Sequence, residues 1–131
     1  MTVRSRRLRD ERGASAVELA LYMPLLLLVI LLAVQSTLVF LGNQAASAVA
    51  RETARVARAT GDIADARRNG AEYAENIGKG VLEGYKIQIV AVGNDKVRVT
   101  VTGHAQEILP FGVPEVSQTV EGPIERFVET E

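Results

Sequence analysis

The sequence predicts an α+β protein: a long N-terminal transmembrane helix, followed by a second helix and a small antiparallel sheet of about three strands. Two observations support this fold class. A long apolar segment without any charged residue lies near the N-terminus, and farther along the chain the apolar residues change from helical spacing to strict alternation. With 131 residues, the chain is long enough for one ordinary domain.

The apolar segment extends from Leu19 to Leu41, and only Pro24 and the triplet Gln35-Ser36-Thr37 depart from its apolar character. As a helix it would be about 34 Å long, and the hydrocarbon core of a bilayer is about 30 Å thick. A helix that is apolar on all sides belongs in lipid or in the middle of a large protein, and this chain is too small to have such a middle. We therefore expect a transmembrane helix over about residues 19–41. The triplet would lie near one membrane surface, where solvation is a simpler role for it than hydrogen bonding to a partner helix.

The charges on either side of this segment predict its orientation. Arginines precede it at Arg4, Arg6, Arg7, Arg9 and Arg12. Basic residues stay on the cytoplasmic side of a membrane, and the nearest basic residue beyond the segment is Arg51. We expect a single-pass protein of the cytoplasmic (inner) membrane, with the N-terminus inside and everything after Gly42 outside.

Two other interpretations of the N-terminus remain open. A secretory signal peptide also combines a basic start with an apolar stretch, and Ala46-Ser47-Ala48 fits its cleavage site. Its apolar region spans only about 7–15 residues, however, and here a longer stretch is preceded by the acidic Glu18. A plain uncleaved anchor would need no special residues.

The long helix is expected to continue beyond the membrane, because the stretch from Asn43 to Thr60 is rich in alanine and contains neither glycine nor proline. Helical spacing places three arginines on one face: Arg51, Arg55 and Arg58. It places a stripe of small residues on another face: Ala46, Ala50, Ala54 and Ala57. The small residues would let a neighbouring helix come close. Equally, alanine is simply a good helix former.

A small exterior unit is expected after the long helix. Gly61 ends that helix and Asp62 caps a second one, which extends to about Leu82 by the spacing of its apolar residues. Alternating residues then predict two strands around the hairpin loop Gly93-Asn94-Asp95, and a third strand ending near Glu121. At this size a lone core is marginal, so packing against the long helix or against other subunits should matter. The expected organisation is a basic leader at 1–13, a long helix at 14–60 and an extracytoplasmic α+β domain at 61–131.

Composition excludes several functions. Lys plus Arg number 15 against 16 Asp plus Glu, and the net charge of −1 gives no reason to expect a nucleic-acid partner. The chain has no cysteine and a single histidine, His104, so thiol catalysis, a histidine-pair metal site and most catalytic triads are excluded. We find no nucleophile–base pair and no phosphate-binding glycine loop. We therefore expect no enzyme activity, no catalytic residue, no cofactor, no metal and no small-molecule substrate.

One local motif carries chemical information. In Arg12-Gly13-Ala14-Ser15-Ala16-Val17-Glu18 a basic leader ends in glycine, a carboxylate follows five residues later, and the apolar helix begins there. This motif resembles the prepilin-peptidase site of type IV pilin-like proteins. Together with Leu19-Ala20-Leu21-Tyr22-Met23-Pro24 and the leucine run after it, the segment is similar to the opening of the TadE-like family. Members of that family are minor pilins, or pseudopilins, of the tight-adherence (Tad/Flp) type IV pilus machinery.

The resemblance implies roles for four residues. Cleavage would fall between Gly13 and Ala14, because a glycine lets a membrane-embedded protease approach the backbone closely. Glu18 would pair with the new amine of Ala14 in an adjacent subunit, in a low dielectric. Alternatively, it is only an acid in the first helical turn, favoured by the helix dipole. Pro24 removes a backbone hydrogen bond, which loosens the helix in pilin-like proteins but is also a tolerated kink in any membrane helix.

The resemblance therefore implies a minor pilin-like structural subunit, processed by a prepilin peptidase and packed through its N-terminal helix. Its partners would be other pilin or pseudopilin subunits and the Tad assembly machinery, in the membrane and in the cell-surface pilus. The mature chain would begin with Ala14, whereas mature type IV pilins commonly begin with an aromatic residue. The alternative is an uncleaved single-pass scaffold protein of the pilus or secretion machinery.

Overall fold

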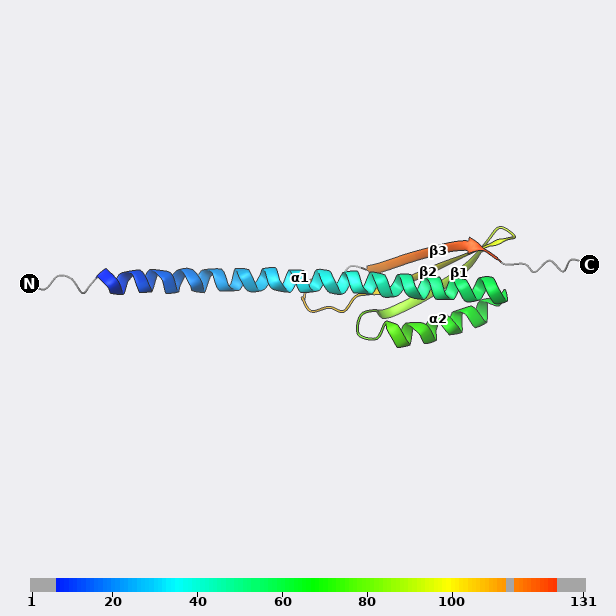
Figure 1. Ribbon diagram of the computed structural model, residues 1–131, viewed down its shortest axis with the longest axis horizontal. Helices are drawn as coiled ribbons and strands as arrows, with labels where there is room; N and C mark the ends of the chain where they lie inside the picture. Colours follow the sequence, from blue (N-terminus) through cyan, green and yellow to red (C-terminus); the bar gives the residue numbers. More distant parts are fainter. Residues whose placement is uncertain (1–6, 113–114, 125–131) are drawn as a thin grey trace, which may run out of the picture. The chain divides into compact units, whose positions relative to one another are not determined.

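The computed structural model describes residues 7–112 and 115–124, with side chains from Gly13 onward. The elements follow the predicted α+β order: α1 (Arg7–Thr60), α2 (Ile63–Ile77), β1 (Glu83–Val92), β2 (Lys96–His104) and β3 (Glu115–Pro123) (Figure 1). The first part of the expected leader, residues 1–6, lies outside the described residues. By its contacts the chain forms two compact units, one ending at Val34 and one beginning at Gln35.

The first unit is the N-terminal part of α1. The helix begins at Arg7, upstream of the expected start at Ala14, because the intervening arginines, leucine and glutamate are all good helix formers. The neighbouring residues Leu25, Leu26 and Leu27 are all exposed, so the apolar surface continues around the helix. Within the described part of the chain, α1 is the one helix long and apolar enough to cross a membrane. The predicted long apolar N-terminal helix is therefore confirmed, and its length and composition fit a single membrane crossing.

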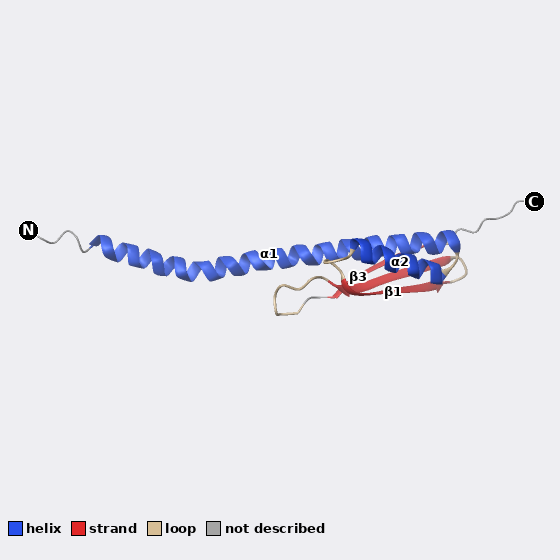
Figure 2. Cartoon of the chain, turned by 90° about the horizontal axis from the view of Figure 1, so that it is seen from below, coloured by secondary structure: helices blue, strands red, loops and turns tan. Residues whose placement is uncertain are grey.

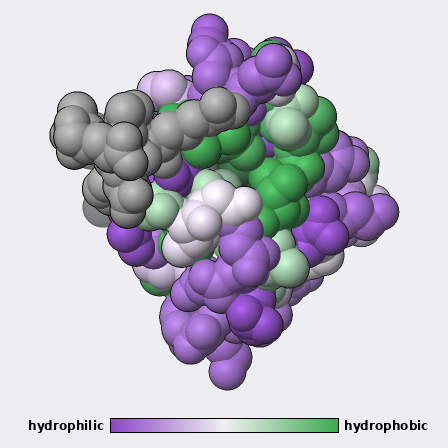
Figure 3. All heavy atoms as spheres, turned by 90° about the vertical axis from the view of Figure 1, so that its right-hand side faces the viewer, coloured by the Kyte–Doolittle hydropathy of each residue, from purple (hydrophilic) through white to green (hydrophobic). Residues whose placement is uncertain are grey.

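The second unit has two layers, a helical layer and a three-stranded antiparallel sheet. The strand order is β1-β2-β3, and the helices α1 and α2 cover one face of the sheet (Figure 2). Val97, Val99 and Val101 of β2 are buried beneath the helices, whereas Arg98 on the other face forms an ion pair with Glu121. The alternation that predicted this strand thus separates a buried face from a solvated one. An end-on view from the side of the β1–β2 hairpin shows a mostly hydrophilic surface around a smaller apolar area (Figure 3).

The core of this unit consists mainly of alanine and valine, and much of it comes from α1. The small-residue stripe of α1 is buried in it, with Ala46 and Ala50 fully covered and Ala54 and Ala57 nearly so. Small side chains let the helix lie close to its neighbours. The stripe is therefore used for packing within the chain.

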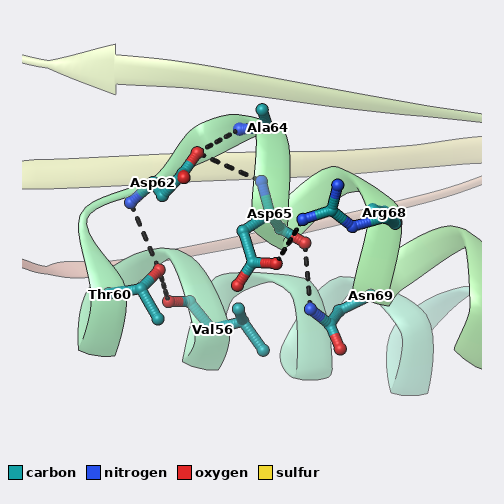
Figure 4. A network of polar contacts seen from close by, with 7 residues as sticks. All are labelled: Val56, Thr60, Asp62, Ala64, Asp65, Arg68 and Asn69. Atoms are coloured by element: carbon teal, nitrogen blue, oxygen red, sulfur yellow. Dashed lines mark hydrogen bonds and ion pairs between the residues drawn. The ribbon is translucent and has the colours of Figure 1, made fainter.

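The corner between α1 and α2 is held by side-chain caps (Figure 4). The Asp62 carboxylate accepts hydrogen bonds from the backbone N–H groups of Ala64 and Asp65, at 2.9 and 3.1 Å, as predicted for a helix N-cap. The Thr60 hydroxyl donates to the Val56 carbonyl and accepts from the Asp62 N–H. These bonds satisfy backbone groups that would otherwise be unpaired where one helix ends and the next begins.

The second helix ends earlier than expected, at Ile77 instead of about Leu82. Gly78 closes it, because its N–H donates to the Ala74 carbonyl at 2.8 Å and its backbone leads into a turn. Gly80 then adopts a positive φ of 81°, which no continuing helix allows. Leu82 has helical spacing but is buried next to the start of β1. Its apolar character reflects the core and gives no information about helix length.

The strands are confirmed and slightly longer than the sequence pattern indicated. The hairpin loop at residues 93–95 joins Val92 to Lys96, which pair across it, and Gly93 has the positive φ such a turn requires. The third strand begins at Glu115 and ends at Pro123. His104 is the last residue of β2, as expected for a polar residue at a strand end.

Candidate functional site

The predicted processing site lies on the exposed surface of α1. Gly13 and Ala14 are both within the helix and both exposed. A Cβ atom added at Gly13 would meet no other atom within 4 Å. Packing among the described residues therefore gives no reason for a glycine at this position.

Glu18 lies one turn farther along the same helix. Its side chain lines a shallow groove together with Ser15, Leu19 and Tyr22, which share one helical face. Leu19 and Tyr22 are well exposed, so the carboxylate lies beside apolar surface. Among the side chains that the structure describes, Glu18 has no hydrogen-bond or ion-pair partner. A carboxylate at the edge of a membrane segment gains from a cationic partner, and such a partner would have to come from outside these residues.

Pro24 does not interrupt α1, whose helical backbone continues on both sides of it. The helix curves in its N-terminal half (Figure 2), as is common when a proline removes one bond from the ladder. The residue is exposed on the surface of the apolar segment. The four predicted site residues thus follow one another along a single exposed stretch of helix.

Gln35, at the far end of the apolar segment, has a different role from the one expected. Its Nε2 donates to the Gln106 carbonyl at 3.2 Å, and its Oε1 accepts from the Ile108 N–H at 3.0 Å. Interface solvation was the simpler expectation for this residue, and for Gln35 that expectation is wrong. Both ends of the side-chain amide bind the loop between β2 and β3, and sequence spacing could not have indicated a contact over such a separation.

Two further side chains join α1 to the sheet. Asn43 Oδ1 accepts a hydrogen bond from Gln118 Nε2 at 3.1 Å, and Arg58 Nε donates to the Pro123 carbonyl at 2.7 Å. Both partners lie in β3. Arg58 therefore differs from the other arginines of its predicted face, which point to solvent.

The arginine face of α1 is otherwise solvated. Arg51 and Arg55 are exposed, and Arg55 forms an ion pair with Glu52 at 2.7 Å. The hydrogen bond from Arg55 lowers the pKa of the Glu52 carboxyl below its usual value. An exposed pair one turn apart contributes little to stability, so this face is best described as a solvated helix surface.

No catalytic geometry emerges in the described part of the chain. Residues 7–112 and 115–124 contain no group of three side chains able to hold a metal ion. A wider open groove lies between α2 and β1 and is lined by Arg67 and residues 86–90. Its polar side chains are cations and an amide, and they do not form the acid–base pair that hydrolysis requires.

These features define a class of protein: a chain with a single candidate membrane helix that continues into the core of a small α+β unit. Residues 13–55 match the family model described as TadE-like protein. The match covers about a third of the chain and includes all four predicted site residues, and it confirms the resemblance seen in the sequence. No curated protein and no solved structure matches the chain.

The match is a similarity of this segment to the TadE-like family. The long apolar helix, which overlaps the matched segment, fits a single-pass membrane protein by its length and composition. The matched segment ends at residue 55, before α2 and the sheet.

Proposed function

We propose that this chain is a minor pilin, or pseudopilin, of the Tad pilus. In this proposal a prepilin peptidase cuts between Gly13 and Ala14, and the mature chain packs into an assembly through its N-terminal helix. The observation that carries the proposal is Glu18, a carboxylate without a partner among the described side chains, set beside exposed apolar surface at the start of the membrane helix. The open space around Gly13 supports it, because packing against the described residues does not explain the glycine.

The chemistry of assembly follows from these positions. Cleavage creates an α-amine on Ala14, and an α-amine is positively charged below a pKa of roughly 8. The Glu18 carboxylate of a neighbouring subunit would pair with this amine. Because the pair lies among apolar helices, water would screen it weakly, and it would fix the axial register between subunits.

Orientation is part of the same proposal. The arginines of the leader would hold it on the cytoplasmic side, so α2 and the sheet would lie outside the cytoplasmic membrane. The finished subunit would leave the membrane for the pilus or its initiation complex. The substantial unit beyond the membrane helix favours a minor or initiating subunit over a shaft component.

The second candidate is an uncleaved scaffold protein of the pilus machinery. One observation favours it: α1 is continuous from Arg7 through Gly13 and Ala14, so the peptide bond to be cut lies within a helix. A protease binds its substrate as extended backbone, so this helical turn would have to unwind before cleavage. Unwinding it costs free energy. Glycine lowers that cost, since it is a poor helix former.

The first experiment asks whether the leader is removed. Intact mass and N-terminal sequencing of the protein purified from membranes should give a chain that begins at Ala14. Gly13→Leu should retain the leader while still inserting into the membrane, because the added side chain obstructs the scissile bond. Ala20→Leu places the same side chain on the exposed helix beyond the motif and should be cut normally. An uncut wild-type chain would favour the scaffold, and a mature N-terminus at Val49 would indicate ordinary secretion.

The second experiment tests the carboxylate. Glu18→Gln keeps the size and hydrogen bonding of the side chain but removes its charge, so processed monomer should accumulate in the membrane with few or no pili. Glu72→Gln, at an exposed acid of α2, is the matched control and should assemble as the wild type does. If Glu18 mattered only for membrane insertion, removing its charge would make insertion easier and would not reduce assembly. Normal piliation with Glu18→Gln would contradict the ion-pair proposal.

A further inference from the structure

The loop between β2 and β3 combines buried and exposed apolar residues in an unusual way. Leu109 is 8% exposed and anchors the loop in the core, whereas Ile108 is 42% exposed and Phe111 is 80% exposed. The Glu107 carboxylate accepts a hydrogen bond from the Gly112 N–H at 3.1 Å, which closes the turn between them. The loop thus presents a large aromatic side chain to its surroundings from a defined conformation.

The loop is fixed to α1 at two positions, Gln35 and Gly42, which are about two helical turns apart. Gln35 binds it through both ends of its side-chain amide, to Gln106 and Ile108. At Gly42, a Cβ atom would lie 3.2 Å from the Ala105 Cβ, so the base of the loop lies directly against the helix there. Figure 2 shows the loop extending past the end of the sheet, alongside the part of α1 that belongs to the same unit.

The position of Gln35 on α1 lies near the expected membrane surface. Counted along the chain from Leu19, about 20 helical residues cross the hydrocarbon core, so Gln35 lies near its far edge. Phe40 and Leu41, on the same stretch of α1, are also exposed apolar residues. The second unit thus has exposed apolar residues on this stretch of α1 and on the loop that Gln35 binds.

We propose that the β2–β3 loop is a second membrane contact, in which Phe111 and Ile108 enter the interfacial region of the bilayer while Gln35 holds the loop in position. Apolar and aromatic side chains bind about 5–10 Å into the boundary between head groups and acyl chains. Aromatic rings are favoured at that level. Glu107, the one charged residue between Ala105 and Gly112, would lie among head groups, where a carboxylate costs little. This contact does not depend on cleavage at Gly13 or on pilus assembly.

The natural absence of tryptophan gives a direct test. Phe111→Trp places one fluorophore on the loop of the full chain, which is inserted at one chain per lipid nanodisc. In discs whose acyl chains are brominated near the head groups, the tryptophan of this variant should lose most of its fluorescence and emit at shorter wavelength than in water. Val90→Trp is the matched control: Val90 is 55% exposed on β1, away from the loop, and a tryptophan there should be unaffected by bromination.

Two results would overturn the proposal. Equal behaviour of the Phe111→Trp and Val90→Trp variants would show that the loop stays in water. Shielding of the loop tryptophan that appears only when a disc holds two chains would show that a second copy covers the loop.

Introducing Gln35→Leu into Phe111→Trp should weaken the quenching, because the loop loses both hydrogen bonds while the helix stays apolar. Unchanged quenching in that double variant would contradict the positioning role of Gln35.

Discussion

At Gly70, α2 lies directly against α1. A Cβ atom at this position would overlap the Thr53 hydroxyl oxygen and would lie 3.1 Å from the Ile87 Cδ1. Thr53 is fully buried, and its hydroxyl has no hydrogen-bond partner among the described residues. Sequence propensity marks Gly70 only as a weak point of the helix. Its actual role is steric, and that role becomes visible only when the neighbouring helix is in place.

Gly70→Ala should therefore destabilise the second unit. Alanine would improve helix propensity by up to about 1 kcal/mol, but the overlap with Thr53 should cost more, for a net loss of about 1–3 kcal/mol. Chemical denaturation followed by circular dichroism would measure the change. In the double variant Gly70→Ala/Thr53→Ala, the removal of the Thr53 hydroxyl and methyl groups relieves the overlap. The double variant should thus lose less stability than the two single variants lose together. A loss equal to that sum would contradict the steric explanation.

At the scale of elements, Tyr85 connects the first strand to the second helix. Its hydroxyl donates to Glu75 Oε1 at 2.8 Å and lies 3.3 Å from the Ala71 carbonyl, both in α2. Burial raises the pKa of the Tyr85 phenol, and the hydrogen bond to Glu75 and the charge of that carboxylate raise it further. The neutral phenol is therefore the form that the fold prefers.

This preference predicts a pH dependence. Because the folded-state pKa of Tyr85 lies above its unfolded value, its contribution to stability is complete below the unfolded pKa. That contribution is lost as the pH rises through the folded pKa. The stability advantage of the wild type over Tyr85→Phe should be about 0.5–1.5 kcal/mol at neutral pH and should shrink above about pH 10. Denaturant titrations at a series of alkaline pH values would show it, and a constant difference would contradict it. Glu75→Gln should reduce the pH dependence without abolishing it, because burial is the larger cause.

The elements themselves could mostly be predicted from local patterns. β2 alternates strictly because one face contacts the helices and the other contacts water, and Asp62 is a cap that needs only its own neighbours. The end of α2 was predicted too late, because Leu82 continues the apolar spacing although Gly78 and Gly80 stop the helix. Sequence periodicity shows which residues are buried. It does not show whether a buried residue belongs to a helix or to a loop.

At the scale of the whole molecule, α1 belongs both to the membrane segment and to the core of the second unit. Val49, Ala50 and Thr53 are fully buried in that unit, and Val49 and Ala50 share its core with Val99 and Val101 of the central strand. The sequence indicated that a small unit would need further packing, against the long helix or against other subunits. It could not indicate that the covering residues would be the alanine stripe, because alanine is equally common in helices that touch nothing.

We therefore expect the α+β unit to fold only with its part of α1. A fragment of residues 61–131 should stay largely unfolded, since the apolar face of its sheet has lost its cover. A fragment of residues 35–131 should fold, because it contains the whole compact unit. Amide dispersion in NMR spectra would separate the two outcomes. Cooperative unfolding of the shorter fragment would show that the contribution of α1 is dispensable.

The candidate site was predictable to a different extent from the fold. Gly13, Ala14, Glu18 and Pro24 belong to one continuous motif, so their identity needed no tertiary structure, and the family match covers all of them. The contact of Gln35 with the β2–β3 loop joins residues that are 71 and 73 positions apart, and no local pattern encodes it. The motif residues are exposed on one helix, whereas contacts of this kind depend on how the chain folds back on itself.

The small side chains of the core also affect how stability responds to temperature. The heat capacity of unfolding arises mainly from the apolar surface that becomes exposed, and is typically roughly 12–15 cal/mol/K per residue. Alanines such as Ala46, Ala50 and Ala54 bring little hydrocarbon into the core, although their burial is complete or nearly so. The heat capacity change of this unit should therefore be low for its length, and its stability curve correspondingly flat. Cooling would weaken such a core less than one built of leucine and phenylalanine.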